Sequence, residues 1–136
     1  MRFLYLRDPL FLICLGLYAA NRWAFELWMP RSFFTNHFND LICIPFCVPI
    51  MLFLLRCLRL RSDDSPPQPD EILVPLILWA AVFELWLPNL PVFRGLATAD
   101  YLDVFYCTLG ASIAGIWWRV WYGREIGEEA EELEEA

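Results

Sequence analysis

FELWMP at Phe25–Pro30 recurs as FELWLP at Phe83–Pro88, fifty-eight residues later in a chain of 136. Five of the six letters agree, and each copy sets one glutamate among aromatic and aliphatic residues. Chance recurrence of so tryptophan-rich a string is improbable, so the two copies indicate an internal repeat. Each copy also ends an apolar segment with a proline, which is typical of a helix terminus.

The residues around the copies follow the same order in both halves of the chain. After each copy a polar loop leads to an aspartate, Asp40 or Asp103, which opens a second apolar segment. An arginine follows each aspartate at a spacing of sixteen residues, at Arg56 and Arg119. We interpret the chain as two half-units, each built as helix, outer loop, aspartate, helix and arginine.

The composition indicates that these segments lie in a bilayer. Hydrophobic residues make up 59% of the chain and the mean hydropathy is +0.44, whereas a soluble domain is roughly 45–50% apolar. The apolar residues form four segments, about 9–30, 40–59, 71–88 and 102–122. The first is long enough to cross the hydrocarbon core as a helix, and the middle two are short for that purpose.

The arginines, the only basic residues apart from one histidine, predict the orientation. Three fall on one side of the predicted helices, at Arg22, Arg31 and Arg94, and seven on the other, at Arg2, Arg7, Arg56, Arg59, Arg61, Arg119 and Arg124. By the positive-inside rule, both termini and the 59–70 loop are cytoplasmic. The sequence thus predicts an all-α integral membrane protein, with four transmembrane helices as two parallel two-helix repeats and both termini cytoplasmic.

These segments divide the chain into one membrane domain and a tail. Residues 1–122 form the membrane domain, with repeat 1 at about 9–59, a cytoplasmic Pro-rich linker at 60–70 and repeat 2 at about 71–122. Asp70 is expected to cap the third helix. An inner aromatic belt is expected at the end of the fourth helix, from Trp117, Trp118, Trp121 and Tyr122.

Residues 123–136 form an acidic cytoplasmic tail with seven glutamates. The net charge of the chain is -7, but the residues before Glu125 carry ten acidic and ten basic side chains, so they are neutral and offer no basic surface for nucleic acid. Because glutamates four residues apart repel, we expect a solvated tail that is frayed or disordered.

A parallel repeat implies a pseudo-twofold axis along the membrane normal. It places a cluster of charged residues at the outer surface, comprising Arg22, Glu26, Asp40, Glu84, Arg94, Asp100 and Asp103. The aspartates are suited to capping helices. Arg22 lies one turn before Glu26 and can neutralise it. At the corresponding place before Glu84 stands Ala80, so we expect Glu84 to find Arg94 or Arg22, or else to serve a function.

The two returning helices differ in their packing residues. Pro45 and Pro49 interrupt the first, where they free backbone carbonyls. In the second, small residues recur at i,i+4, which allows close contact between helices; they are Gly110, Ala111, Ala114 and Gly115.

The sequence predicts no metal site and no cofactor. The five cysteines all lie in apolar runs, where a free cysteine behaves as a small hydrophobic residue. Cys43 and Cys47 are one helical turn apart, but the only histidine is His37 and there is no second cysteine pair. The number and type of ligands therefore fall short of a structural zinc site.

From Phe83 to Gly115 the chain reads FELWLPNLPVFRGLATADYLDVFYCTLGASIAG. This string resembles the C-terminal signature of VanZ-like membrane proteins, with matches at Glu84, Arg94, Asp100, Asp103, Gly110 and Gly115. TNHFNDLICIPF, with Asp40, is similar to the family's first aspartate-containing helix start. The family's glutamine, asparagine and basic residue are replaced by Leu87, Cys107 and Leu41, respectively. The resemblance implies a divergent small multi-helix protein of the bacterial inner membrane.

Three functions follow from these features. The first is a non-enzymatic envelope protein whose outer polar cluster binds a head group, an envelope precursor or a partner protein. The second is a small proton- or cation-coupled transporter that works as a homo-oligomer through Glu84 and Glu26. The third is a lipid-modifying enzyme, which ranks last because His37 and Ser112 do not form a nucleophile–base set.

Overall fold

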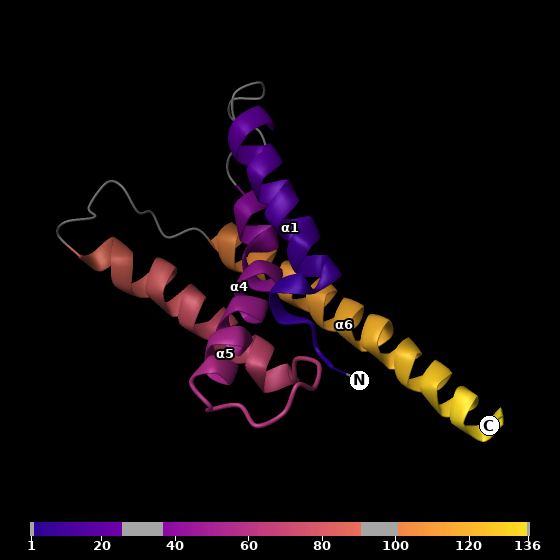
Figure 1. Ribbon diagram of the computed structural model, residues 1–136. Coiled ribbons are helices and arrows are strands. Elements are labelled where there is room, and N and C mark those ends of the chain that lie inside the picture. Colours follow the sequence, from indigo (N-terminus) through magenta and orange to yellow (C-terminus); the bar gives the residue numbers. More distant parts are fainter. Residues whose placement is uncertain (1, 26–36, 91–100, 136) are drawn as a thin grey trace.

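The computed structural model describes residues 2–25, 37–90 and 101–135, with side chains except at Phe25, Glu84, Leu85, Pro88 and 124–135. Its main helices are α1 (Pro9–Ala20), α4 (Phe38–Cys57), α5 (Pro69–Ala80) and α6 (Tyr101–Glu135) (Figure 1). No strand occurs in the described ranges, so the prediction of an all-helical chain is confirmed.

The first and third segments are each shorter as α-helices than the apolar runs that encode them. α1 and α5 have 12 residues each, about 18 Å at 1.5 Å per residue. Both continue as π-helix, at Asn21–Phe25 and at Ala81–Trp86, and the second ends in a 3-10 turn at Leu87–Asn89. The change to π-helix thus falls at or just before FELW in both halves.

Local signals explain where the helices begin and end. Asp8 caps α1 by accepting a hydrogen bond from the Phe11 amide at 3.0 Å, and Pro9 supplies the fixed φ that favours a first helical position. At α5, the Gln68 amide donates to Glu71 Oε2 at 2.9 Å. Glu71 therefore fills the role that we predicted for Asp70, which lies exposed in the same first turn.

α4 lies at the centre and packs most extensively against α6. The apolar residues between these helices include Ile44, Val48 and Leu52 of α4 and Ala111, Ala114 and Trp118 of α6. Among the described helices, α4 is the one long and apolar enough to cross a membrane, as judged by length and composition. The structure therefore contains one candidate span where the sequence predicted four.

α4 and α6 approach each other closely at Gly110. Pro45 has no N–H, so the carbonyl of Leu41, four residues earlier, loses its usual helical donor. That carbonyl lies against Gly110, where an added Cβ would overlap its oxygen. The α4 proline and the α6 glycine therefore act together, because one frees the carbonyl and the other leaves room for it.

The segment before α1 is buried against the middle of α6. Phe3 is 1% exposed and packs edge-on against Trp118. Asp8 is fully buried and accepts hydrogen bonds from Trp118 Nε1 at 3.2 Å and from the Tyr122 hydroxyl at 2.7 Å. The prediction that Trp118 and Tyr122 belong to an interfacial belt is wrong, because both are core residues whose polar atoms bind Asp8.

Ion pairs and hydrogen bonds fix the linker between α4 and α5 to this N-terminal segment. Arg61 is 7% exposed, and its guanidinium forms a two-point contact with Glu71, at 2.9 and 3.1 Å. It also donates to the Tyr5 hydroxyl at 3.2 Å. Asp64 in turn accepts from that hydroxyl at 2.7 Å and pairs with Arg2 and Arg56.

The attachment of the N-terminal segment should weaken in acid. Hydrogen bonds from Tyr5 and Arg2 hold the pKa of the Asp64 carboxyl below its usual value. A lowered folded-state pKa stabilises the contact fully above the ordinary carboxyl value of about 3.9, and the stabilisation is lost as pH falls through the folded-state pKa. The protection of the amides of residues 2–7 against hydrogen exchange, relative to the intrinsic exchange rate at each pH, should fall below about pH 4. In Asp64→Asn this acid-dependent step should be absent, and its persistence there would contradict the assignment.

Large apolar side chains cover the outward faces of the outer helices. The exposed residues include Leu12, Ile13 and Leu15 of α1, Leu73, Val74, Ile77 and Leu78 of α5, and Leu109, Ile113, Ile116 and Val120 of α6. Large exposed apolar surfaces are typical of proteins that bind a partner or contact a membrane.

The backbone of α6 remains helical to Glu135, whereas we expected a frayed or disordered tail beyond residue 122. The expectation treated the acidic stretch as an isolated helix. As an extension of α6, the stretch does not have to nucleate a helix, and nucleation is the unfavourable step in helix formation.

Candidate functional site

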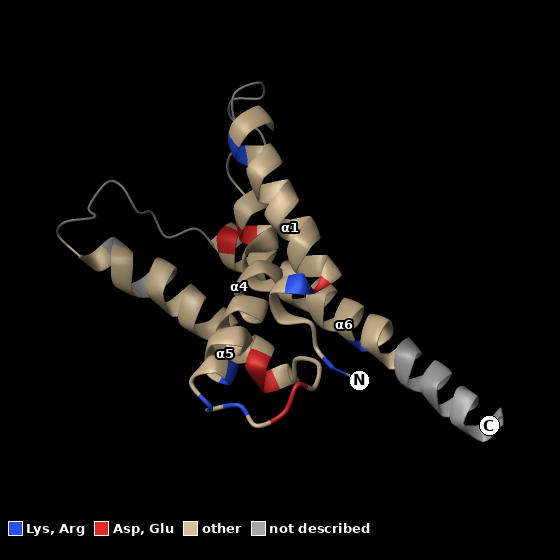
Figure 2. Ribbon diagram, in the orientation of Figure 1, with Lys and Arg blue, Asp and Glu red and all other residues tan. Residues whose placement is uncertain are grey.

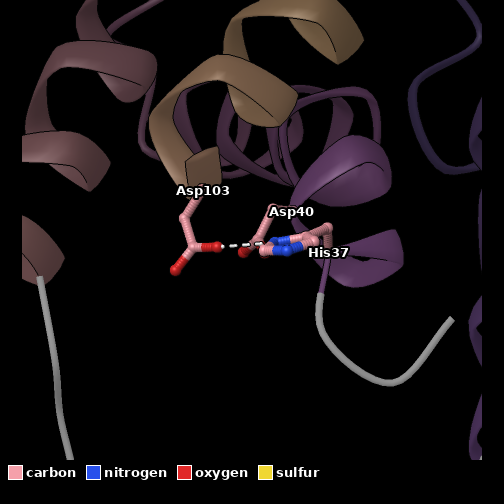
Figure 3. A group of neighbouring side chains, drawn as sticks. All are labelled: His37, Asp40 and Asp103. Carbon is pink, nitrogen blue, oxygen red and sulfur yellow. Dashed lines mark hydrogen bonds and ion pairs between the residues drawn. The ribbon is translucent and has the colours of Figure 1, made fainter. Parts of the chain in front are cut away.

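Two aspartates from the two halves of the chain meet where α4 and α6 begin. Asp40 is the third residue of α4, and Asp103 is the third residue of α6. Both helices start at the same end of their shared contact, where acidic segments of the two ribbons lie together (Figure 2). The two carboxyl groups therefore lie close together (Figure 3). The two aspartates, which occupy matching positions in the two halves of the sequence, are therefore neighbours in the structure.

His37, the residue immediately before α4, completes the cluster. Its Nδ1 lies 3.0 Å from Oδ1 of Asp103 (Figure 3), and its ring stacks on Tyr106 with the centroids 5.1 Å apart. The ligand atoms of His37, Asp40 and Asp103 all lie within 4.8 Å of one another. We call these three residues the acidic site.

A small cavity of about 120 Å³ opens beside the two carboxylates. Trp79, Ala80 and Phe83 of the third segment form its apolar wall, and Val104 and Cys107 of α6 complete it with Asp40 and Asp103. Cys107 lies one turn deeper than Asp103, and its thiol contacts that of Cys43 on α4. The cavity lining thus combines two carboxyl groups with an apolar wall.

The acidic site is partly open to its surroundings. The side chains of His37 and Asp103 are 19% and 35% exposed, so small ions can reach them. The N-terminal ends of α4 and α6 stabilise negative charge here. Two carboxylates so close nevertheless repel, and either a shared proton or a bound cation relieves that repulsion.

The structure brings only part of the predicted polar cluster into this site. Asp40 and Asp103 meet, whereas Arg22 is exposed on the π-helical continuation of α1. Glu84 lies in the π-helix Ala81–Trp86, and its side chain is outside the described part. Glu26, Arg94 and Asp100 also lie outside the described residues.

The three residues predicted to support helix packing have different surroundings. Gly110 lies against the Leu41 carbonyl, and Ala114 is fully buried in the core. Gly115 faces α5, where an added Cβ would meet Ile72 at 3.5 Å, an ordinary contact distance.

Sequence reasoning missed two residues that the structure singles out. His37 was treated as an isolated loop histidine, because its partner Asp103 is 66 residues away. Asp8 was overlooked between Arg7 and Pro9, although an aspartate just before a proline is a recognisable helix start. Its other partners lie at least 110 residues away and could not be inferred locally.

The arrangement provides ligands and counter-charges. His37, Asp40 and Asp103 each offer one possible ligand atom, and these atoms lie within 4.8 Å of one another. The Ser112 hydroxyl donates to the Thr108 carbonyl at 2.8 Å, and Ser112 lies nine residues, about 13 Å, along α6 from Asp103. The structure therefore does not join Ser112 to His37 in a nucleophile–base pair.

Comparison of the chain with family models, curated proteins and solved structures yields no match.

Proposed function

We propose that the chain is a multi-pass membrane protein of a bacterial cell envelope that binds a positively charged group at the acidic site and catalyses no reaction. The group is a cation, or the cationic part of a head group, an envelope precursor or a partner protein. The observation that carries the proposal is the convergence of Asp40, Asp103 and His37 beside a cavity at the end of the α4–α6 contact.

Several features support placement of four helices in a membrane. α4 has the length and composition of a span, and apolar side chains face outward on α1, α5 and α6. The N-terminal segment, the linker and the region around Tyr122 share one end of the molecule. The acidic site lies at the other end of α4, as expected for a chain with both termini on the cytoplasmic side.

The repeat is supported by matched positions in the two halves. Asp40 and Asp103 occupy the third place of their helices and lie side by side, as residues near a twofold axis do. Both first helices change to π-helix around FELW. The proposed relationship to VanZ-like proteins rests on the residues of the signature, of which Asp103 and Gly110 both lie at the α4–α6 contact.

Binding is favoured over transport by the packing beneath the site. Ile44, Val48 and Leu52 are fully buried along the side of α4 that faces α6. Ala111 and Ala114 fill the opposing face. A coupled carrier uses polar groups near the middle of the membrane, whereas the described core at this depth is apolar.

The proposal predicts that cations protect the two aspartates from a hydrophobic carbodiimide. The full chain, purified in detergent, is labelled and digested, and modification at each carboxyl is measured by mass spectrometry. Choline, tetramethylammonium and divalent metal ions are tested separately, because amines with N–H groups would react with the activated carboxyl. Labelling at Asp40 and Asp103 should fall severalfold with at least one of them. Asp70, exposed on α5, is the internal control and should be unaffected.

The outcomes separate the competing functions. Labelling of Asp40 and Asp103 that no cation changes would refute the proposed function. Proton- or cation-coupled flux in proteoliposomes, abolished by Asp103→Asn, would replace binding with transport. Release of a head group from labelled lipid would replace it with an enzyme.

A further inference from the structure

We propose that the cation taken by the acidic site is a divalent first-row transition-metal ion, Zn²⁺ or one of similar coordination chemistry, held by His37, Asp40 and Asp103. This inference rests on the proposed function, because it identifies the ligand of the same site. It does not follow from acidic residues alone, since an imidazole nitrogen joins the two carboxylates and a cavity adjoins them.

The spacing of the ligand atoms suits a metal of this size. Zinc bonds to nitrogen and oxygen are about 2.0–2.2 Å long, which places two tetrahedral ligand atoms about 3.4 Å apart. Nδ1 of His37 and Oδ1 of Asp103 are already 3.0 Å apart. All three ligand atoms lie within 4.8 Å of one another, so rotation of the side chains would bring them to the spacing that a bound ion requires.

The charge of the site matches a divalent ion. Asp40 and Asp103 bring two negative charges, and a neutral His37 adds a nitrogen ligand without charge. A divalent ion therefore neutralises the set and removes the repulsion between the carboxylates.

The surroundings hold the imidazole and leave one position open. Stacking on Tyr106 fixes the plane of the His37 ring, as partners outside a metal's ligand set commonly do. Three protein ligands leave a fourth tetrahedral position, which a water molecule or an oxygen atom of an envelope component can fill. The cavity walled by Trp79 and Phe83 provides space beside the two carboxylates.

The ligand types distinguish among metals. Imidazole with carboxylate favours zinc and its first-row neighbours, whereas Mg²⁺ and Ca²⁺ prefer oxygen alone. Copper(I) prefers thiolates, and in this chain the Cys43 and Cys107 thiols contact each other deeper between α4 and α6. The proposed ligand set therefore excludes the cysteines, which makes it testable by spectroscopy.

The test is metal binding by the full chain in detergent after treatment with a chelator. Calorimetric titration with Zn²⁺ should give one ion per chain. His37→Gln, Asp40→Asn and Asp103→Asn should each weaken the affinity by at least about 10–100-fold, the range that even outer partners of metal ligands produce. Asp70→Asn, which changes an exposed carboxyl on α5 in the same way, should leave the affinity unchanged.

Co²⁺ provides a second readout that does not depend on the variants folding. With nitrogen and oxygen ligands it should show visible bands of a four- or five-coordinate ion, without a thiolate charge-transfer band in the near ultraviolet.

No Zn²⁺ binding by the wild type, unchanged affinity in folded Asp40→Asn, or a thiolate band would overturn the metal proposal. If choline still protects Asp40 and Asp103 while Zn²⁺ does not bind, only the metal assignment falls. If no cation protects the two aspartates and Zn²⁺ does not bind, both the metal assignment and the proposed function are refuted.

Discussion

Asp8→Ala should lower the free energy of unfolding by about 4 kcal/mol, because buried hydrogen-bond donors then lose their acceptor at about 1–3 kcal/mol each. The Asp8 carboxylate is fully buried and binds Trp118 Nε1, the Tyr122 hydroxyl and the Phe11 amide. Loss of the cap of α1 contributes about 1 kcal/mol to that total. Unfolding in detergent, followed by circular dichroism, measures the difference.

Two further variants sharpen this test. Asp8→Asn keeps one acceptor oxygen and should lie between Asp8→Ala and the wild type. Asp70→Ala removes an exposed carboxyl from the first turn of α5 and should change stability by about 0.5 kcal/mol or less. If Asp8→Ala were as stable as Asp70→Ala, the buried network between the N-terminal segment and α6 would not exist as described.

Gly110→Ala should destabilise the chain by about 2 kcal/mol, although alanine is the better helix former. Its Cβ would overlap the carbonyl of Leu41, and overpacking of this kind typically costs about 1–3 kcal/mol. The neighbour that must move is helix backbone, which cannot rotate away as a side chain would. Denaturation in detergent gives the stability, and cation binding at the acidic site should weaken because α4 and α6 are forced apart.

Glycines elsewhere in the chain provide matched controls for this substitution. A Cβ at Gly16 on α1 meets nothing within 4 Å, so Gly16→Ala should be neutral or stabilise by up to about 1 kcal/mol through helix propensity. Gly115→Ala should be tolerated, since the nearest atom is a flexible Ile72 methyl at 3.5 Å. Equal effects at Gly16 and Gly110 would show that close contact with Leu41 is not the reason for the glycine.

The helical class and the approximate helix positions were predictable, because apolar runs and prolines are local signals. α4 begins within two residues of its expected start at Asp40, and α6 within one residue of residue 102. The π-helical continuations of α1 and α5 were not predicted, because a preference for π-helix over α-helix leaves no simple pattern in sequence.

The candidate site was predictable in part. The repeat gave Asp40 and Asp103 equivalent positions, and the structure places them together. It did not identify His37, because the contact of that residue with Asp103 depends on how α4 crosses α6. The same limit applies to Trp118 and Tyr122: aromatic residues near a helix end suggest an interfacial belt, and only the fold brings Asp8 within hydrogen-bond distance of both.

The central claim is that Asp40 and Asp103 form one cation site, and the stability of Asp40→Asn with and without cation tests it most directly. This variant leaves the contact between His37 and Asp103 in place. In chelator it should unfold at the wild-type temperature or above, because it removes the repulsion between the two carboxylates. With Zn²⁺ at 100 times its dissociation constant the wild type should gain about 2.7 kcal/mol, and the variant should gain much less. A wild type that no cation stabilises, or a variant destabilised equally in both conditions, would contradict the account.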